Sequence, residues 1–175
     1  PLYDPQINKI LVPYTFITEV KERFVKAKYS ETGVTPDEAT NDALMHTLFH
    51  ELGHALIEMY QLPVVGKEED AVDSLANVLL IEFYDEGQET VLSAADLFDL
   101  ESEDKGGSFE EADFWDEHSL DEQRYYNTLC HVYGSDPDKY ASAIEGTDIS
   151  DDRAELCIEE YEAAARNWFK LLKIK

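Results

Sequence analysis

The stretch TPDEATNDALMHTLFHELGHALIEMY, residues 35–60, decides the fold and holds the most informative pattern in the chain. Thr35 can cap a helix, Pro36 suits the first turn, and Glu38 completes a capping box. Pro63 follows the stretch, and the residue before a proline is disfavoured in a helix. We therefore expect one long helix from about residue 35 to about residue 60.

The middle of this helix carries the pattern H-E-x-x-H, formed by His50, Glu51 and His54. Residues four positions apart lie on one helix face, so both imidazoles can reach one metal ion. Glu51 can then reach a water activated by that ion, which is where a general base is needed. The pattern predicts a zinc site with Glu51 as general base, and the alternative is a pair of core histidines. His46, one turn earlier, is expected to pack or to support the site without binding the metal.

A catalytic zinc needs three protein ligands and one open position. The turn around Gly66 allows a second helix over residues 67–84, on which Glu69 and Asp73 share one face. We predict Glu69 as the third zinc ligand. Asp73 is expected to accept a hydrogen bond from a ligating imidazole, which orients the ring and fixes its tautomer. Glu68 and Asp73 remain alternatives for the third ligand.

The rest of the chain is expected to be mostly helical, in one domain over residues 1–175. A strand through residues 10–12 is expected to pair with a segment that precedes Pro1, which would form a small N-terminal hairpin. The acidic stretch 96–122 is expected to be a solvated loop broken at Gly106-Gly107, and it lacks the ligand spacing of an EF-hand calcium site. The fold class is therefore mainly α (α+β). The other expected helices cover about residues 15–29, 90–100, Ser119 to Gly134, a short segment from Asp136, and a last segment from Ser150 or Asp151.

Composition excludes several classes of protein. The chain has 175 residues, of which 43% are hydrophobic, enough for a folded core. Its 39 acidic and 14 basic residues give a formal net charge of -25, which argues against nucleic acid or an anionic membrane as partner. The longest aliphatic run, residues 78–81, is far shorter than the roughly 20 residues of a membrane span. Because the chain starts at Pro1 without methionine, we expect a trimmed product, compatible with removal of a signal segment.

Taken together, these motifs resemble the gluzincin type of zincin metallopeptidase: H-E-x-x-H, a glutamate on the next helix, and an aspartate four residues later. More narrowly, the chain resembles an uncharacterised bacterial family of zinc metallopeptidases, and the resemblance covers most of its length. It implies a zincin-like fold, bound Zn²⁺, a peptide or protein substrate, and an opening segment that this chain lacks. The resemblance rests on residues 3–5, 50–56, 68–73, 117–124 and 133–137, and on Cys157 with Glu160-Tyr161.

Peptide hydrolysis also needs a donor that stabilises the oxyanion. His118 is our first choice, because it sits beside two carboxylates and just before a helix cap and is thus held locally. His131 is expected at the surface. The other donor candidates are Tyr125, Tyr126, Arg124 and His131.

The rival functions are a non-catalytic zincin-like binding module and an acidic protein that mimics nucleic acid. The sequence does not indicate the oligomeric state.

The only two cysteines are Cys130 and Cys157, and neither has a C-x-x-C partner or a zinc-finger spacing. Both lie on inward stripes of their expected helices. Two buried free thiols are one possibility. We favour a disulfide, because a pair of cysteines in an exported hydrolase fits an oxidising compartment. A periplasmic or secreted location is therefore expected.

Overall fold

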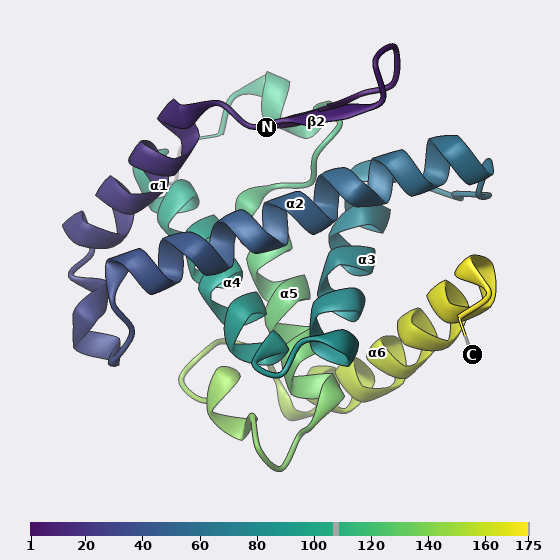
Figure 1. Ribbon diagram of the computed structural model, residues 1–175. Coiled ribbons are helices and arrows are strands. Elements are labelled where there is room, and N and C mark those ends of the chain that lie inside the picture. Colours follow the sequence, from purple (N-terminus) through teal and green to yellow (C-terminus); the bar gives the residue numbers. More distant parts are fainter. Residues whose placement is uncertain (107–108, 175) are drawn as a thin grey trace.

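Helices form most of the structure, a computed structural model that describes residues 1–106 and 109–174 (Figure 1). The described part of the chain contains six α-helices and one two-stranded antiparallel hairpin, which confirms the mainly helical fold class. The strands are β1 (Leu2–Asp4) and β2 (Lys9–Leu11), and the helices are α1 (Tyr14–Lys26), α2 (Pro36–Tyr60), α3 (Glu68–Phe83), α4 (Gly87–Asp104), α5 (Asp121–Ser135) and α6 (Asp151–Leu172). Short 3-10 turns lie at Tyr29–Thr32 (η1), Glu111–Phe114 (η2) and Ala141–Ala143 (η3).

The long helix α2 begins as its sequence predicts. The Thr35 hydroxyl accepts a hydrogen bond from the Glu38 backbone N–H, and the Glu38 carboxylate accepts one from the Thr35 N–H. Figure 1 shows α2 running across α3 and α4, against which it packs. The hairpin also contacts α2. One long helix therefore forms a common wall for the hairpin and the helices beneath it.

Helix α3 is the centre of the core. It packs against α2, α4, α5 and α6, so apolar side chains cover it on nearly all sides. Such burial fixes the position of its first turns, where Glu69 and Asp73 lie. The buried residues of the hydrophobic core around α3 are Ile57, Val72, Leu75, Val78, Leu79, Leu80, Ile81, Val91, Val132, Tyr140, Tyr161 and Trp168.

Gly53 explains how closely α2 and α3 approach each other. A Cβ at position 53 would lie 2.9 Å from the Cβ of Val72 on α3, closer than packed carbon atoms tolerate. A larger residue there would push the start of α3 away from α2. The glycine inside H-E-x-x-H thus lets Glu69 come within reach of the two histidines.

The hairpin differs from expectation, because the partner of β2 does not precede Pro1. Strand β1 pairs with β2, with Leu2 opposite Leu11. The intervening turn is closed by local hydrogen bonds: the Gln6 N–H donates to the Asp4 carboxylate, and the Tyr3 hydroxyl donates to the Asn8 side chain.

The acidic stretch 96–122 is only partly a loop: the helix expected over about residues 90–100 is present as part of α4 and continues to Asp104, so the loop expectation was wrong up to that residue. Leu97 and Phe98 are buried, and their burial favours helix over loop. Basic residues of α1 offset the charge, since Arg23 and Lys26 lie 3.1 Å and 3.0 Å from Asp104. Gly107, where the loop was expected to break, lies outside the described residues.

Two helix starts were also misplaced. Helix α5 is capped at Leu120, whose N–H donates to the Gln123 side chain, while Ser119 donates its hydroxyl to Asp70 on α3. Asp136 does not start a helix. It opens a turn in which its carbonyl accepts from the Tyr140 N–H, and η3 follows. The last helix does begin at Asp151, with Ser150 as its cap. No helix among the described residues is long and apolar enough to span a membrane.

The favoured disulfide is present between Cys130 on α5 and Cys157 on α6. Both residues are buried, and α5 and α6 pack tightly, since a Cβ at Gly134 would lie 2.3 Å from the Cys157 carbonyl oxygen. The bridge therefore ties α6 to the helix that follows His118.

Replacing both cysteines with alanine should lower the free energy of unfolding by roughly 3.6 kcal/mol, because the bridge closes a loop of about 28 residues in the unfolded chain. Urea unfolding of both proteins measures the difference. Mass spectrometry of unreduced, alkylated protein from its native compartment checks the bridge itself. Two alkylated cysteines in that sample would contradict the assignment.

Candidate metal centre

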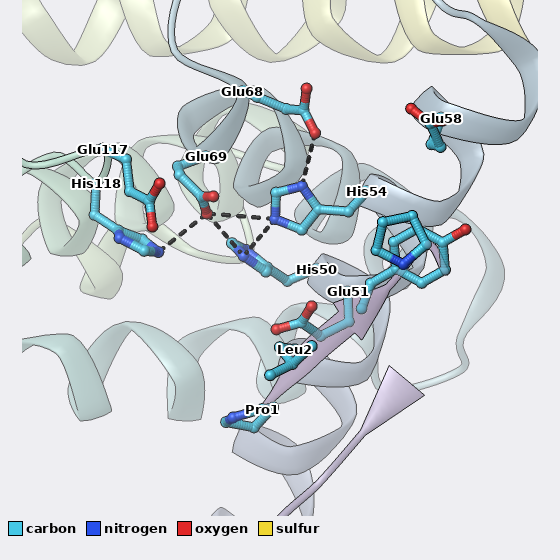
Figure 2. Close-up of a pocket in the computed structure, with 12 residues that line it drawn as sticks. Pro1, Leu2, His50, Glu51, His54, Glu58, Glu68, Glu69, Glu117 and His118 are labelled. Atoms are coloured by element: carbon cyan, nitrogen blue, oxygen red, sulfur yellow. Dashed lines mark hydrogen bonds and ion pairs between the residues drawn. The ribbon is translucent and has the colours of Figure 1, made fainter. Parts of the chain in front are cut away.

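Three imidazoles surround one carboxylate oxygen at the start of α3. Glu69 Oε2 lies 3.1 Å from His50 Nε2, 3.4 Å from His54 Nε2 and 3.0 Å from His118 Nε2 (Figure 2). The Nε2 atoms of His50 and His54 are 3.3 Å apart. Helix α2, helix α3 and the segment before α5 therefore each contribute to one cluster.

The far sides of the two α2 histidines fix their tautomers. His50 Nδ1 lies 2.7 Å from Asp73 Oδ1, and His54 Nδ1 lies 2.8 Å from Glu68 Oε1. An ionised carboxylate only accepts hydrogen bonds, so each Nδ1 carries a proton. Each neutral ring then presents the lone pair of Nε2 to the cluster.

Glu69 Oε2 is a buried oxygen without a hydrogen-bond partner among the described residues, although it makes ion-pair contacts with the imidazoles. A buried carboxylate oxygen without a hydrogen bond is costly. In their neutral forms, His50 and His54 direct the lone pairs of their Nε2 atoms toward this oxygen. His50, His54 and Glu69 thus form a set of donors that could hold a metal ion, and a cation there would satisfy all three.

Electrostatics keeps the cluster charged. Burial alone would lower the pKa of His50, but Asp73 and Glu69 outweigh it and raise that pKa to about 9. Burial alone would raise the pKa of Glu69, but the imidazoles of His118, His50 and His54 hold it well below its usual range. Glu69 therefore stays ionised across the neutral range and is available as a ligand, whereas metal binding would displace the proton from His50.

A further ion pair supports Asp73. Arg124 donates from Nε to Asp73 Oδ2 at 2.7 Å and from Nη2 to Oδ1 at 3.0 Å. Its guanidinium lies 4.0 Å from the centre of the Phe98 ring. Arg124, a candidate oxyanion donor by sequence, is instead paired with the carboxylate that orients His50.

The segment that carries His118 docks on the first turn of α3. Lys67 Nζ donates to the backbone carbonyls of Asp116 and His118, at 3.0 Å and 2.9 Å. Asp70 accepts from the Ser119 hydroxyl at 3.0 Å. The intervening Glu68 and Glu69 contact the histidines, so four consecutive residues at the start of α3 organise the centre. Sequence reasoning missed Lys67 and Asp70, because their partners lie about fifty positions away in the chain.

A family comparison agrees with this geometry. A family model described as "Putative metallopeptidase" matches residues 1–172. The chain belongs to this family. Among curated proteins and solved structures, no match to the chain was found. The description of the family suggests a hydrolase, and the His50–His54–Glu69 group could hold a metal ion.

The candidate metal centre of this family member opens into a cavity of about 340 Å³. Glu51, which is 7% exposed, lines it beside the histidines (Figure 2). Tyr125 and Tyr126 do not line it, and their rings contact each other. The lining residues are Pro1, Leu2, Tyr3, Pro5, His50, Glu51, His54, Glu58, Glu68, Glu69, Glu117 and His118.

Of the remaining two histidines, His46 is buried and His131 is partly buried. His46 Nε2 is 2.9 Å from the Asn77 side chain, so His46 packs behind the site as expected. His131 was expected at the surface, which is wrong: its ring lies 3.3 Å from Asn77 and packs on Tyr161. Burial lowers the pKa of both histidines to about 4 and keeps them neutral. The face of α5 that carries Arg124 and His131 packs against polar residues of α3. The sequence around these two residues contains no pattern that could have predicted this contact.

Proposed function

We propose that the protein is a zinc-dependent metallopeptidase in which His50, His54 and Glu69 hold the metal and Glu51 is the general base. The convergence of two oriented imidazole nitrogens on a buried carboxylate oxygen that forms no hydrogen bond among the described residues carries this proposal. Two nitrogens and one oxygen are a common ligand set of catalytic zinc, in which the fourth position stays open. The cavity beside Glu51 gives a substrate access to that position.

The proposed reaction is the hydrolysis of a peptide bond. Zinc, when bound, polarises the scissile carbonyl and lowers the pKa of water towards about 7. Glu51 accepts the proton of the attacking water and delivers it to the leaving amine. Asp73 and Glu68 hold the two imidazoles in one tautomer throughout. His118 donates a hydrogen bond from Nε2 to the oxyanion.

One observation favours a second candidate, a non-catalytic zinc-binding module. His118 Nε2 is as near to Glu69 Oε2 as His50 Nε2 is, at 3.0 Å against 3.1 Å. If His118 were a fourth ligand, the site would be closed, as structural zinc sites are. Glu51 counts against this candidate, since a base is unnecessary for holding the metal.

Metal analysis combined with a peptide-library cleavage assay separates the two functions. We expect one zinc per chain, cleavage that stops after treatment with a chelator, and recovery when zinc is added. Tight zinc binding without cleavage of any peptide would favour the binding module. Cleavage that persists after removal of the metal would overturn the proposal.

His118→Ala should lower the turnover number about 10²–10³-fold at unchanged zinc content, because it removes one donor to the oxyanion. Turnover is measured with a cleavable peptide, and zinc by metal analysis of the same sample. Near-normal turnover would contradict this role for His118. Loss of zinc would show that His118 is a ligand.

Lys67→Met should also lower turnover, because it removes the two hydrogen bonds from Lys67 that help to hold the His118 segment against α3. Lys67→Arg should restore part of the loss. The effects of Lys67→Met and His118→Ala should be non-additive in the double variant, as for residues that act as a unit. Lys170→Met, which removes an exposed cation on α6, is the matched control. Additive effects would contradict the positioning role.

We also propose that the protein is exported. The disulfide between Cys130 and Cys157 supports this, because such bridges persist in oxidising compartments.

A further inference from the structure

The cavity beside the metal centre is lined by acidic side chains. Five glutamates and three histidines line it, and no lysine or arginine is among its lining residues in the described part of the chain. Three of the glutamates are accounted for: Glu69 and Glu68 contact the histidines, and Glu51 is the proposed base. Glu58 and Glu117 have no assigned role.

Neither remaining carboxylate has a partner among the described residues. Within the part of the chain that the structure describes, no hydrogen bond or ion pair reaches the side chains of Glu58 and Glu117, and both residues are exposed. The nearby cation, Lys67, directs its ammonium to the backbone carbonyls of Asp116 and His118. Two negative charges at the cavity are therefore left for a ligand to neutralise.

The two carboxylates flank the metal centre. Glu58 is one helical turn beyond His54 on α2, and Glu117 directly precedes His118. Figure 2 shows them on opposite sides of His50 and His54. An extended peptide that crosses the centre would have a carboxylate near the residues on either side of its scissile bond.

Glu51 adds a buried negative charge to the same cavity. Its side chain is 7% exposed, lines the cavity, and has no hydrogen-bond or ion-pair partner among the described residues. A concave site with charges of one sign and low-dielectric walls concentrates ligands of opposite charge. The same field disfavours acidic ligands.

We propose that the cavity selects peptides with lysine or arginine next to the scissile bond, and that Glu58 and Glu117 determine this specificity. The inference rests on the proposed peptidase function and deepens it. The chemical group recognised is an ammonium or guanidinium ion. The free α-amino group of a peptide is also an ammonium ion. The experiment must therefore distinguish binding of that group from binding of a lysine or arginine side chain.

The binding experiment uses zinc-loaded Glu51→Gln protein, which is not expected to turn over. Fluorescence anisotropy compares N-acetylated peptides that contain lysine or norleucine at one position, because norleucine has nearly the same length without the charge. We expect lysine to bind about 5- to 20-fold more tightly, with a preference that weakens at high salt. A third peptide, with norleucine and a free amino terminus, tests the alternative source of the cation.

In peptides that carry lysine on one side of the scissile bond or on the other, Glu58→Gln should reduce the preference on one side and Glu117→Gln on the other, whereas Glu159→Gln on α6, which removes the same charge outside the cavity lining, should leave both unchanged. Equal binding of the lysine and norleucine peptides would overturn the inference. So would a preference that appears only with the free amino terminus, or one that both glutamine variants retain in full.

Cleavage of the same peptides by the unaltered protein tests the lysine specificity and the peptidase function separately. Cleavage with equal kcat/KM for lysine and norleucine would contradict the specificity and leave the peptidase function standing. Absence of cleavage of every peptide would contradict the peptidase function, while the binding experiment would still decide the specificity.

Discussion

Glu51→Gln is expected to keep one zinc per chain and to lose hydrolysis, with turnover at least about 10²–10⁴-fold lower. Glutamine nearly preserves the shape of the side chain but cannot accept the proton of the attacking water. Glu51 lines the cavity yet lies outside the His50–His54–Glu69 group, so the metal should stay. Metal analysis and peptide hydrolysis on the same sample give both quantities.

Glu159→Gln is the matched control for this change, because it alters the same chemical group at an exposed position on α6. It should leave both metal content and turnover unchanged. Loss of zinc from Glu51→Gln would mean that Glu51 is a ligand. Retention of turnover would mean that another group accepts the proton.

Glu69→Ala should weaken zinc binding far more than Asp73→Ala does. Glu69 supplies one of three converging donors, whereas Asp73 acts through the imidazole of His50. Removing a carboxylate that orients a ligand typically costs about 10–100-fold in metal affinity. Competition with a chromophoric chelator measures both affinities.

Asp73 also pairs with Arg124, so its alanine variant leaves a partly buried guanidinium without its partner. Asp73→Asn keeps the shape and serves as the second variant. Circular dichroism shows whether each protein remains folded. Normal zinc affinity in folded Glu69→Ala protein would refute its assignment as the third ligand.

The sequence predicts the parts of this site that depend on local spacing. The capping box at Thr35 sets the start of α2, and the interval of four residues places His50 and His54 on one face. The same interval on α3 brings Glu69 to the imidazoles while Asp73 reaches His50 from behind. Helix geometry alone gives the shared face on each helix, whereas the contact between the two faces depends on how α3 packs against α2.

Contacts between distant segments were not predictable. Arg124 and Asp73 are 51 residues apart, as are Lys67 and His118, and each pair depends on how α5 and its preceding segment dock on α3. His131 was placed at the surface because a polar face on a helix usually meets solvent. Here that face meets Asn77 of α3, so one polar surface covers another.

The end of α4 was assigned to a loop because its carboxylates pair with residues that are distant in the sequence. The density of carboxylates after residue 96 is typical of a solvated loop. In the structure, Arg23 and Lys26 of α1 pair with Asp104, and the Tyr29 hydroxyl donates to Asp96. The compensating groups lie more than sixty positions earlier in the chain, where no local pattern connects them to α4.

Anomalous diffraction at the zinc edge, from crystals grown with zinc, tests the central claim most directly. We expect one strong peak about 2.0–2.2 Å from His50 Nε2, His54 Nε2 and a Glu69 oxygen, with no protein atom in the fourth position. A peak that also has His118 Nε2 at about 2.0–2.1 Å would show a closed site and contradict a hydrolytic centre. Absence of zinc from this cluster would contradict the account as a whole.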